Sequence, residues 1–308
     1  MRVVVSGSSG LIGTAACASL AAAGDDVIRL VRRPPASSGE ISWDPQAADG
    51  GIGRGALDGA DAVVHLAGAP IASGRWTAVR KQEIRDSRIS GTRGLVSALT
   101  AMAHPPSVLL SGSAIGFYGD TGGREVDESA PAGTGFLADV VGEWEATAAP
   151  ADDAGIRVVN LRTGIVLSRR GGVLGRLLPL FRLGLGARIG SGSQVMSWIM
   201  LTDVVRIIRF LLDRADIEGP VNLTAPQPAT NAEFTAALAS AAGHRARLGL
   251  PAAALRLGLG EVAGELLSSA RVMPRRLLDA GGKELWLGGG PIGSALAAEL
   301  GPAGPGTG

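Results

Sequence analysis

The stretch of sequence that decides the fold is Gly7-Ser8-Ser9-Gly10-Leu11-Ile12-Gly13, which lies between a short apolar run, Arg2 to Ser6, and an alanine-rich segment, Leu11 to Ala23. The run is typical of a buried strand, and the segment of a helix that Gly24 ends. In this context the glycines permit a tight turn, a close approach to a pyrophosphate, and close packing of helix and strand. The first helical N–H groups then face phosphates. All seven residues are therefore predicted to form a dinucleotide-binding loop, the alternative being an ordinary glycine-containing turn.

The end of the next predicted strand, Val27 to Val31, indicates which dinucleotide binds. Folds of this type that prefer NAD place an acid about twenty residues past the glycines, where it bonds the ribose 2′-hydroxyl. Here Arg32 and Arg33 occupy that place, and no acid follows until Glu40. Two guanidinium groups suit a 2′-phosphate, so NADP is favoured over NAD. The alternative is a solvated surface pair.

Short apolar runs alternate with helical patterns through the first half of the chain. Further strands are expected at 62–66, 107–111 and 156–161, and helices at 77–103 and 136–149. Apolar strands spaced by helices argue for a parallel sheet covered on both faces. The expected fold class is α/β, a doubly wound parallel sheet (Rossmann) with a smaller C-terminal substrate lobe.

The expected domain boundary lies near residue 165, where the regular alternation of predicted strands and helices becomes less regular. Residues 1–165 are assigned to an NADP-binding Rossmann domain, to which later segments return, and residues 166–300 to the substrate lobe. Residues 301–308, rich in Gly and Pro, are predicted to be a disordered tail.

Within the lobe, capping residues suggest where helices begin. Asp203 is placed as the N-cap of a helix that ends at Leu212, and either Thr230 or Asn231 as the cap of the next. Pro251 is expected at the first position of a further helix.

Composition excludes several classes of function. With 29 Lys+Arg against 28 Asp+Glu, the formal net charge is +1, which gives no footprint for nucleic acid or an anionic membrane. The single cysteine excludes a disulfide within the chain, and three separated histidines exclude a Cys/His zinc cluster. No stretch is typical of a targeting or membrane segment, so a cytoplasmic location is expected.

Two further motifs carry a resemblance to a known superfamily. They are His65-Leu66-Ala67-Gly68 and Ser111-Gly112-Ser113-Ala114-Ile115-Gly116-Phe117-Tyr118-Gly119. With the glycine loop, they resemble the short-chain dehydrogenase/reductase superfamily in its extended and atypical, epimerase-like form. The resemblance implies that the cofactor lies along Leu66, Ala67 and Gly68, and that the segment beginning at Ser111 borders the cofactor and carries the active-site serine, Ser113.

More segments narrow the resemblance to the YfcH-like branch of NAD(P)-dependent epimerase/dehydratase-like proteins. They are Arg75-Trp76, Arg162 to Leu167, Phe181 to Gly186, Ile189 to Gly192, Trp198-Ile199 with Asp203, and Thr230 to Phe234. The small C-terminal segment of that branch would match residues from about 248 to 300. Similar sequences carry a histidine where this chain has Met200, which cannot exchange protons. Homodimers are common in the superfamily, and a homodimer stays an open alternative here.

The superfamily's usual catalytic pair is absent from the sequence. That pair is a tyrosine followed four residues later by a lysine, whose charge lowers the phenol pKa. The chain has one tyrosine, Tyr118, and position 122 is glycine. Without a nearby cation, the pKa of Tyr118 is expected to stay near about 10.

Three residues are left as catalytic candidates. Ser113 is expected to bond a substrate carbonyl or hydroxyl, or else to cap its own turn. Tyr118 is expected to help orient that group, or to pack beside the nicotinamide. Arg162 is expected to hold an anionic substrate group, or equally to form an ion pair with an acid such as Glu145.

The leading functional hypothesis is an NADP-dependent oxidoreductase or epimerase-like enzyme acting on a small polar carbonyl or hydroxyl substrate. Two alternatives stay open: a non-redox isomerase, cyclase or lyase on the same scaffold, and a non-catalytic NADP-binding sensor. The sequence does not identify the substrate, because the lobe that selects it contains no motif for a particular chemistry.

Overall fold

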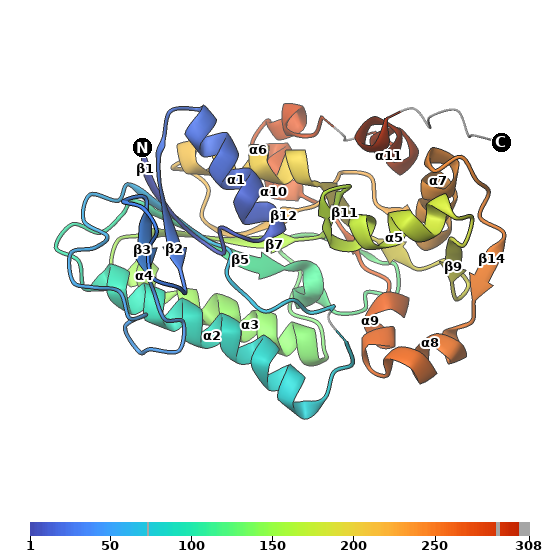
Figure 1. The fold of residues 1–308 in the computed structure, drawn as a ribbon, viewed down its shortest axis with the longest axis horizontal. Coiled ribbons are helices and arrows are strands. Elements are labelled where there is room, and N and C mark those ends of the chain that lie inside the picture. Colours follow the sequence, from blue (N-terminus) through green and yellow to red (C-terminus); the bar gives the residue numbers. More distant parts are fainter. Residues whose placement is uncertain (73, 288–289, 302–308) are drawn as a thin grey trace.

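The computed structural model describes residues 1–72, 74–287 and 290–301, and its main feature is a parallel sheet (Figure 1). The strand order is β12–β7–β5–β4–β1–β2–β3. The strands are β1 (Arg2–Ser6), β2 (Asp26–Val31), β3 (Glu40–Ser42), β4 (Ala62–His65), β5 (Val108–Ala114), β7 (Arg157–Thr163) and β12 (Gly219–Leu223). The order reverses between β1 and β4, where ligands bind in doubly wound sheets. The predicted fold class is confirmed.

Helices cover both faces of this sheet, as expected for parallel strands that are apolar throughout. One face carries α1 (Leu11–Ala22), α6 (Leu201–Asp213) and α10 (Arg275–Asp279), and the other carries α2 (Ala78–Thr100), α3 (Phe136–Ala148) and α4 (Pro150–Asp153) (Figure 1). Alternation along β1 shows why both faces are buried. Val3 and Val5 belong to the core under α1 and α6, whereas Val4 belongs to the core under α2.

The C-terminal lobe packs around a third core. Its larger helices are α5 (Gly172–Arg182), α7 (Asn231–Ala241) and α11 (Ile292–Leu300), and its smaller ones are α8 (Ala252–Leu259) and α9 (Val262–Leu267). The other strands of the described residues form four two-stranded sheets. These pair β8 (Ile165–Ser168) with β11 (Trp198–Met200), β9 (Ala187–Ile189) with β14 (Leu248–Leu250), β10 (Val195–Met196) with β13 (Ala229–Thr230), and β6 (Glu125–Val126) with β15 (Arg271–Val272). Two short 3₁₀ helices are η1 (Ile115–Tyr118) and η2 (Gly282–Leu285).

The three predictions of helix starts had different outcomes. Thr230 caps α7 in a complete capping box with Glu233, which decides between the two expected caps. Asp203 as a cap is wrong: α6 begins at Leu201, and the Asp203 carboxylate accepts a hydrogen bond from the Leu287 N–H at 3.0 Å. Pro251 lies one residue before α8, at the cap position rather than inside the helix.

Two other predictions concern a disordered C-terminal tail and the absence of a membrane-spanning segment. The tail predicted at 301–308 lies, except for its first residue, outside the described residues. Among the residues that are described, no helix combines the length and apolarity needed to cross a bilayer.

Candidate functional site

The glycine loop lies at the carboxyl end of β1, where the strand order reverses. Gly7 has φ +66°, and a Cβ there would come within 2.7 Å of the Leu66 backbone, so this turn brings the loops after β1 and β4 together. Gly13 packs still more closely, because a Cβ there would lie 2.2 Å from the Gly7 oxygen. Gly10 is the N-cap of α1, and among the described residues no side chain caps that helix or places an acid in its first turn. The exposed N–H groups suit phosphate oxygens.

The other loop residues take supporting positions. Leu11 packs against Gly171 and Gly172 at the start of α5, and Ile12 packs against the core under α1. Ser9 is exposed, and the carbonyl of half-buried Ser8 accepts a hydrogen bond from the Thr14 hydroxyl. The loop thus joins α1 to the lobe while its backbone stays accessible.

The segment after β4 runs beside the glycine loop. The Leu66 N–H donates to the carbonyl and hydroxyl oxygens of Ser6, at 3.3 and 3.2 Å, and Ala67 packs on the core under α2. Gly68 lies against Arg88, whose guanidinium donates to the Ala69 carbonyl. Burial lowers the pKa of Arg88 to about 10. A mostly buried cation therefore fixes the loop along which the cofactor is expected to lie.

The two arginines after β2 differ in their partners. Arg33 donates to both carboxylate oxygens of Glu40, at 2.7 and 2.8 Å, whereas Arg32 is exposed and makes no hydrogen bond or ion pair with a described residue. The hydrogen bonds from Arg33, followed by that from the Ala36 N–H, hold the pKa of Glu40 at about 2. Glu40 therefore stays charged and ties Arg33 to the start of β3. Apart from the presence of an acid, nothing in the sequence indicated this pair.

A carboxylate on α3 joins two of the catalytic candidates. Glu145 accepts a hydrogen bond from Ser113 at 2.6 Å and a two-pronged ion pair from Arg162, both arms at 2.8 Å. The side chains of Glu145 and Arg162 are 12% and 5% exposed. The expected ion pair between Arg162 and Glu145 is confirmed. Because Ser113 donates its proton to Glu145, its lone pairs are left to accept one.

Tyr118 lies on the other side of Arg162. Its hydroxyl donates to Asn222 at 2.8 Å and accepts from Arg162 at 2.9 Å, and only 4% of the residue is exposed. The expectation that no cation lies nearby is wrong. Burial nevertheless raises the pKa of Tyr118, outweighing the lowering by Arg162. The phenol is thus saturated by protein partners and is a poor proton donor.

The network continues into the lobe through residues that sequence reasoning missed. The Asn222 amide donates to the Met273 carbonyl at 2.9 Å, and its backbone N–H donates to Glu128 at 3.0 Å. Burial raises the pKa of Glu128. No spacing rule links residues so far apart in the chain, so only the fold brings them to Tyr118.

His65 and Ser111 lie behind the site on paired strands. Both ring nitrogens of His65 have hydroxyl partners, Ser6 at 2.6 Å and Thr92 at 3.0 Å. Burial lowers the pKa of His65 to about 4, so the ring is neutral at pH 7. Ser111 is also fully buried. His65 therefore behaves as a satisfied core residue, and among the described residues no His, Cys, Asp and Glu cluster could hold a metal ion.

Trp198 and Met200 both lie on β11. Trp198 is fully buried in the lobe core and donates through its indole N–H to the Gln227 carbonyl at 3.0 Å. Trp198 therefore packs in the lobe core. Met200 is buried in the same core, and its side chain has no exchangeable proton.

Comparison with known proteins places these features in a family. The model of the NAD dependent epimerase/dehydratase family matches residues 3–223, and that of a domain of unknown function matches residues 250–281. An epimerase family protein of Mycobacterium bovis is 49% identical over 280 residues, 91% of this chain and 92% of that protein. The human epimerase family protein SDR39U1 is 38% identical over 285 residues, covering 91% and 94%.

Solved structures agree with this result. The crystal structure of human SDR39U1 with NADPH superposes with a TM-score of 0.89 at 36% identity, covering 97% of this chain and 99% of that one. A nucleoside-diphosphate sugar epimerase from Corynebacterium glutamicum gives a TM-score of 0.80 at 36% identity, covering 98% of this chain and 58% of the other.

Proposed function

The chain belongs to the NAD dependent epimerase/dehydratase family, and from that premise we propose that it is an NADP(H)-dependent oxidoreductase or epimerase that acts on a small polar carbonyl or hydroxyl substrate. The observation that carries the proposal is the glycine cradle, in which Gly7 and Gly13 leave no room for a side chain. A similar protein, human SDR39U1, has been crystallised with NADPH. When bound, this cofactor supplies or accepts a hydride.

Selection of NADP(H) over NAD(H) is assigned to the two arginines after β2. Arg32 is free to take the 2′-phosphate, and Glu40 holds Arg33 beside it. Glu40 does not serve as a ribose-binding acid in this arrangement, because both of its oxygens are engaged by Arg33.

Proton transfer is assigned to Ser113 and Glu145 in place of the missing tyrosine and lysine. In the oxidising direction the substrate O–H proton would pass to Ser113 as the Ser113 proton passes to Glu145, and NADP⁺, if bound at the glycine loop, would supply the hydride acceptor. Reduction reverses each transfer. Arg162 fixes the carboxylate, and Tyr118 fixes Arg162, so both act as positioning residues.

Cofactor titration tests the first part of the proposal. Nicotinamide fluorescence should report tight NADPH binding and weak NADH binding. Arg32→Ala should weaken NADPH binding by about 10-fold or more and leave NADH binding unchanged, since a charge-assisted hydrogen bond contributes about 1.5–3 kcal/mol. Arg54→Ala is the matched control, because Arg54 is exposed in the loop that leads into β4. Absence of binding by either nucleotide would refute the proposal.

Turnover tests the second part. In a screen of ketones with NADPH and of secondary alcohols with NADP⁺, Glu145→Gln should lower kcat by about 100-fold, within the usual range for general acid–base groups. Glu143→Gln is the control, because Glu143 lies two residues away and pairs with Arg85 at the surface. Equal loss in both variants, or in neither, would contradict the role of Glu145.

A further inference from the structure

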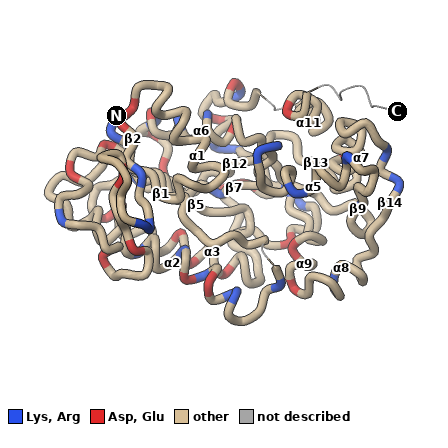
Figure 2. The backbone as a smooth tube through the Cα atoms, in the orientation of Figure 1, with Lys and Arg blue, Asp and Glu red and all other residues tan. Residues whose placement is uncertain are grey.

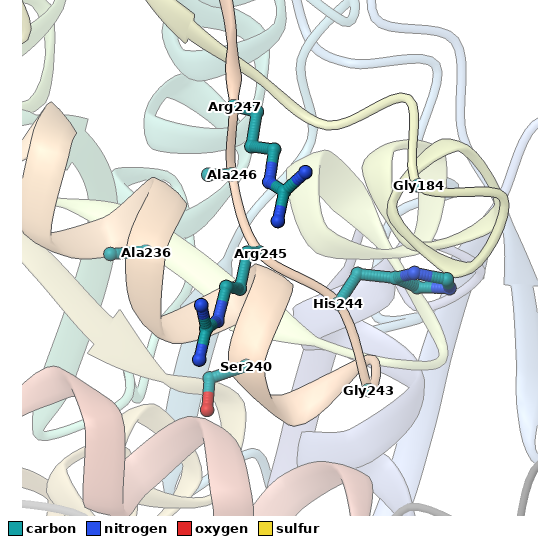
Figure 3. A pocket seen from close by; sticks show the side chains of 8 residues that line it. All are labelled: Gly184, Ala236, Ser240, Gly243, His244, Arg245, Ala246 and Arg247. Carbon is teal, nitrogen blue, oxygen red and sulfur yellow. The ribbon is translucent and has the colours of Figure 1, made fainter.

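A hollow of about 810 Å³ opens in the lobe, away from the glycine loop. It lies between the turn after α5 and the segment that joins α7 to β14 (Figure 3). The lining residues are Gly184, Ala236, Ser240, Gly243, His244, Arg245, Ala246 and Arg247. Its size is within the range of small-molecule sites, about 300–1,000 Å³.

The charge around this hollow is of one sign. The chain as a whole is nearly neutral, yet residues 169–202 and 234–260 contain eight arginines and no aspartate or glutamate. These two stretches supply every lining residue. Figure 2 shows Lys and Arg positions beside α7 and along β14. An anion is therefore attracted to this end of the lobe.

The cationic side chains of the lining are available to a ligand. Arg245 and Arg247 are exposed and make no hydrogen bond or ion pair with any described residue. His244 is fixed, because its Nε2 donates to the Arg182 carbonyl at 2.9 Å and its ring lies against Gly184. Figure 3 shows the Arg245 side chain directed toward the Ser240 hydroxyl. Two guanidinium groups, an imidazole and a hydroxyl thus surround one hollow.

The C-terminus of α7, which lies beside the hollow, repels an anion only weakly. The last carbonyls of α7 would repel negative charge if they were free. They accept instead from the N–H groups of Ala242, Gly243 and His244. The positive charge of the arginines therefore dominates the hollow.

We propose that this hollow binds the phosphoryl group of a small molecule, at a site separate from the nucleotide loop. Arg245 and Arg247 would bond the phosphate oxygens, and the Ser240 hydroxyl would donate a further hydrogen bond. Guanidinium groups match phosphate geometry through paired N–H donors, whereas an acid-free lining rejects cationic ligands.

Isothermal titration of the full chain with sodium pyrophosphate tests the proposal. We expect binding that persists when NADPH is present and that weakens at least about 10-fold in Arg245→Ala/Arg247→Ala. Arg256→Ala is the matched control, because Arg256 is exposed on α8 in the same acid-free stretch but does not line the hollow. Arg247→Glu, which reverses a charge at an exposed position, should abolish binding without loss of the fold.

Four results would overturn the proposal. The first is no binding of pyrophosphate at millimolar concentration, and the second is full affinity in the double variant. The third is loss of pyrophosphate binding in Gly13→Ala alone, which would place the ligand at the glycine loop. Binding to phosphatidylglycerol vesicles without binding to pyrophosphate would also overturn it, in favour of a lipid surface. Since none of these outcomes depends on NADPH binding or turnover, failure here is distinct from failure of the proposed function.

Discussion

Replacement of Gly13 by alanine should weaken both the fold and the binding of NADPH. The added methyl would lie 2.2 Å from the Gly7 oxygen, and real Cβ contacts are essentially never below 3.0 Å. The loop must therefore retreat by about 0.8 Å, the difference between these two distances. Helix α1 cannot retreat instead, because Ala16 and Leu20 are packed in the core.

The size of the effect follows from two opposing terms. Overpacking costs about 1–3 kcal/mol, and alanine regains about 1 kcal/mol of helix propensity, so the expected net loss is up to about 2 kcal/mol. NADPH affinity should fall by about 10-fold or more, because the displaced loop carries the N–H groups that face the phosphates. Urea unfolding and nicotinamide fluorescence measure the two quantities.

A second helical glycine provides the control. In Gly175→Ala, within α5, the new methyl meets no atom nearer than 3.6 Å. That variant should gain about 0.5–1 kcal/mol of stability and keep its affinity for NADPH. If Gly13→Ala behaves like Gly175→Ala in both measurements, the steric reasoning about the loop is refuted.

Three further substitutions have expected outcomes. Burial lowers the pKa of His65 from 6.5 to about 4, so the free energy of unfolding should fall by up to about 3 kcal/mol as pH drops from 6.5 through 4, and His65→Asn should lack that part of the slope in urea titrations. Thr92→Val should cost about 2 kcal/mol or more by calorimetry, because it leaves the Trp144 indole N–H, now bonded at 2.8 Å, and a His65 nitrogen unsatisfied. Glu40→Gln should weaken NADPH binding several-fold in fluorescence titrations, because an amide cannot accept two charge-assisted hydrogen bonds from Arg33 as the carboxylate does. Tighter binding, which loss of a negative charge alone would favour, would contradict this reasoning.

The first half of the fold was predictable because its signals are local. β1, for example, is a continuous apolar run that is followed directly by a glycine turn and a helix-forming stretch. The lobe was less predictable, because its strands have two to four residues and are defined by partners far away. β14, for example, pairs with β9 in a register that sets Leu248 opposite Ala187. No periodicity exists in three residues.

The site likewise combines features with local sequence signals and features that depend on contacts between residues far apart in the chain. The glycine loop could be found from spacing, since its residues are adjacent in the chain. The bond from Tyr118 to Asn222 joins residues 104 positions apart, and that from Arg162 to Tyr118 joins residues 44 apart. The absence of a cation near Tyr118 was wrongly predicted for this reason: the sequence shows only neighbours along the chain, whereas the cation comes from the end of β7.

The placement of Arg162 supports the proposed assignment of proton transfer to Ser113 and Glu145 rather than to Tyr118. A lysine beside a catalytic tyrosine lowers the phenol pKa because its charge has no stronger partner. Arg162 has such a partner: Nε and one Nη atom are bonded to Glu145, and the other Nη atom is left for Tyr118. Its charge therefore stabilises the carboxylate, and burial determines the behaviour of the phenol. A carboxylate oxygen that lies 2.6 Å from the Ser113 hydroxyl and accepts its hydrogen bond is placed to take its proton, which fits a substrate hydroxyl at Ser113.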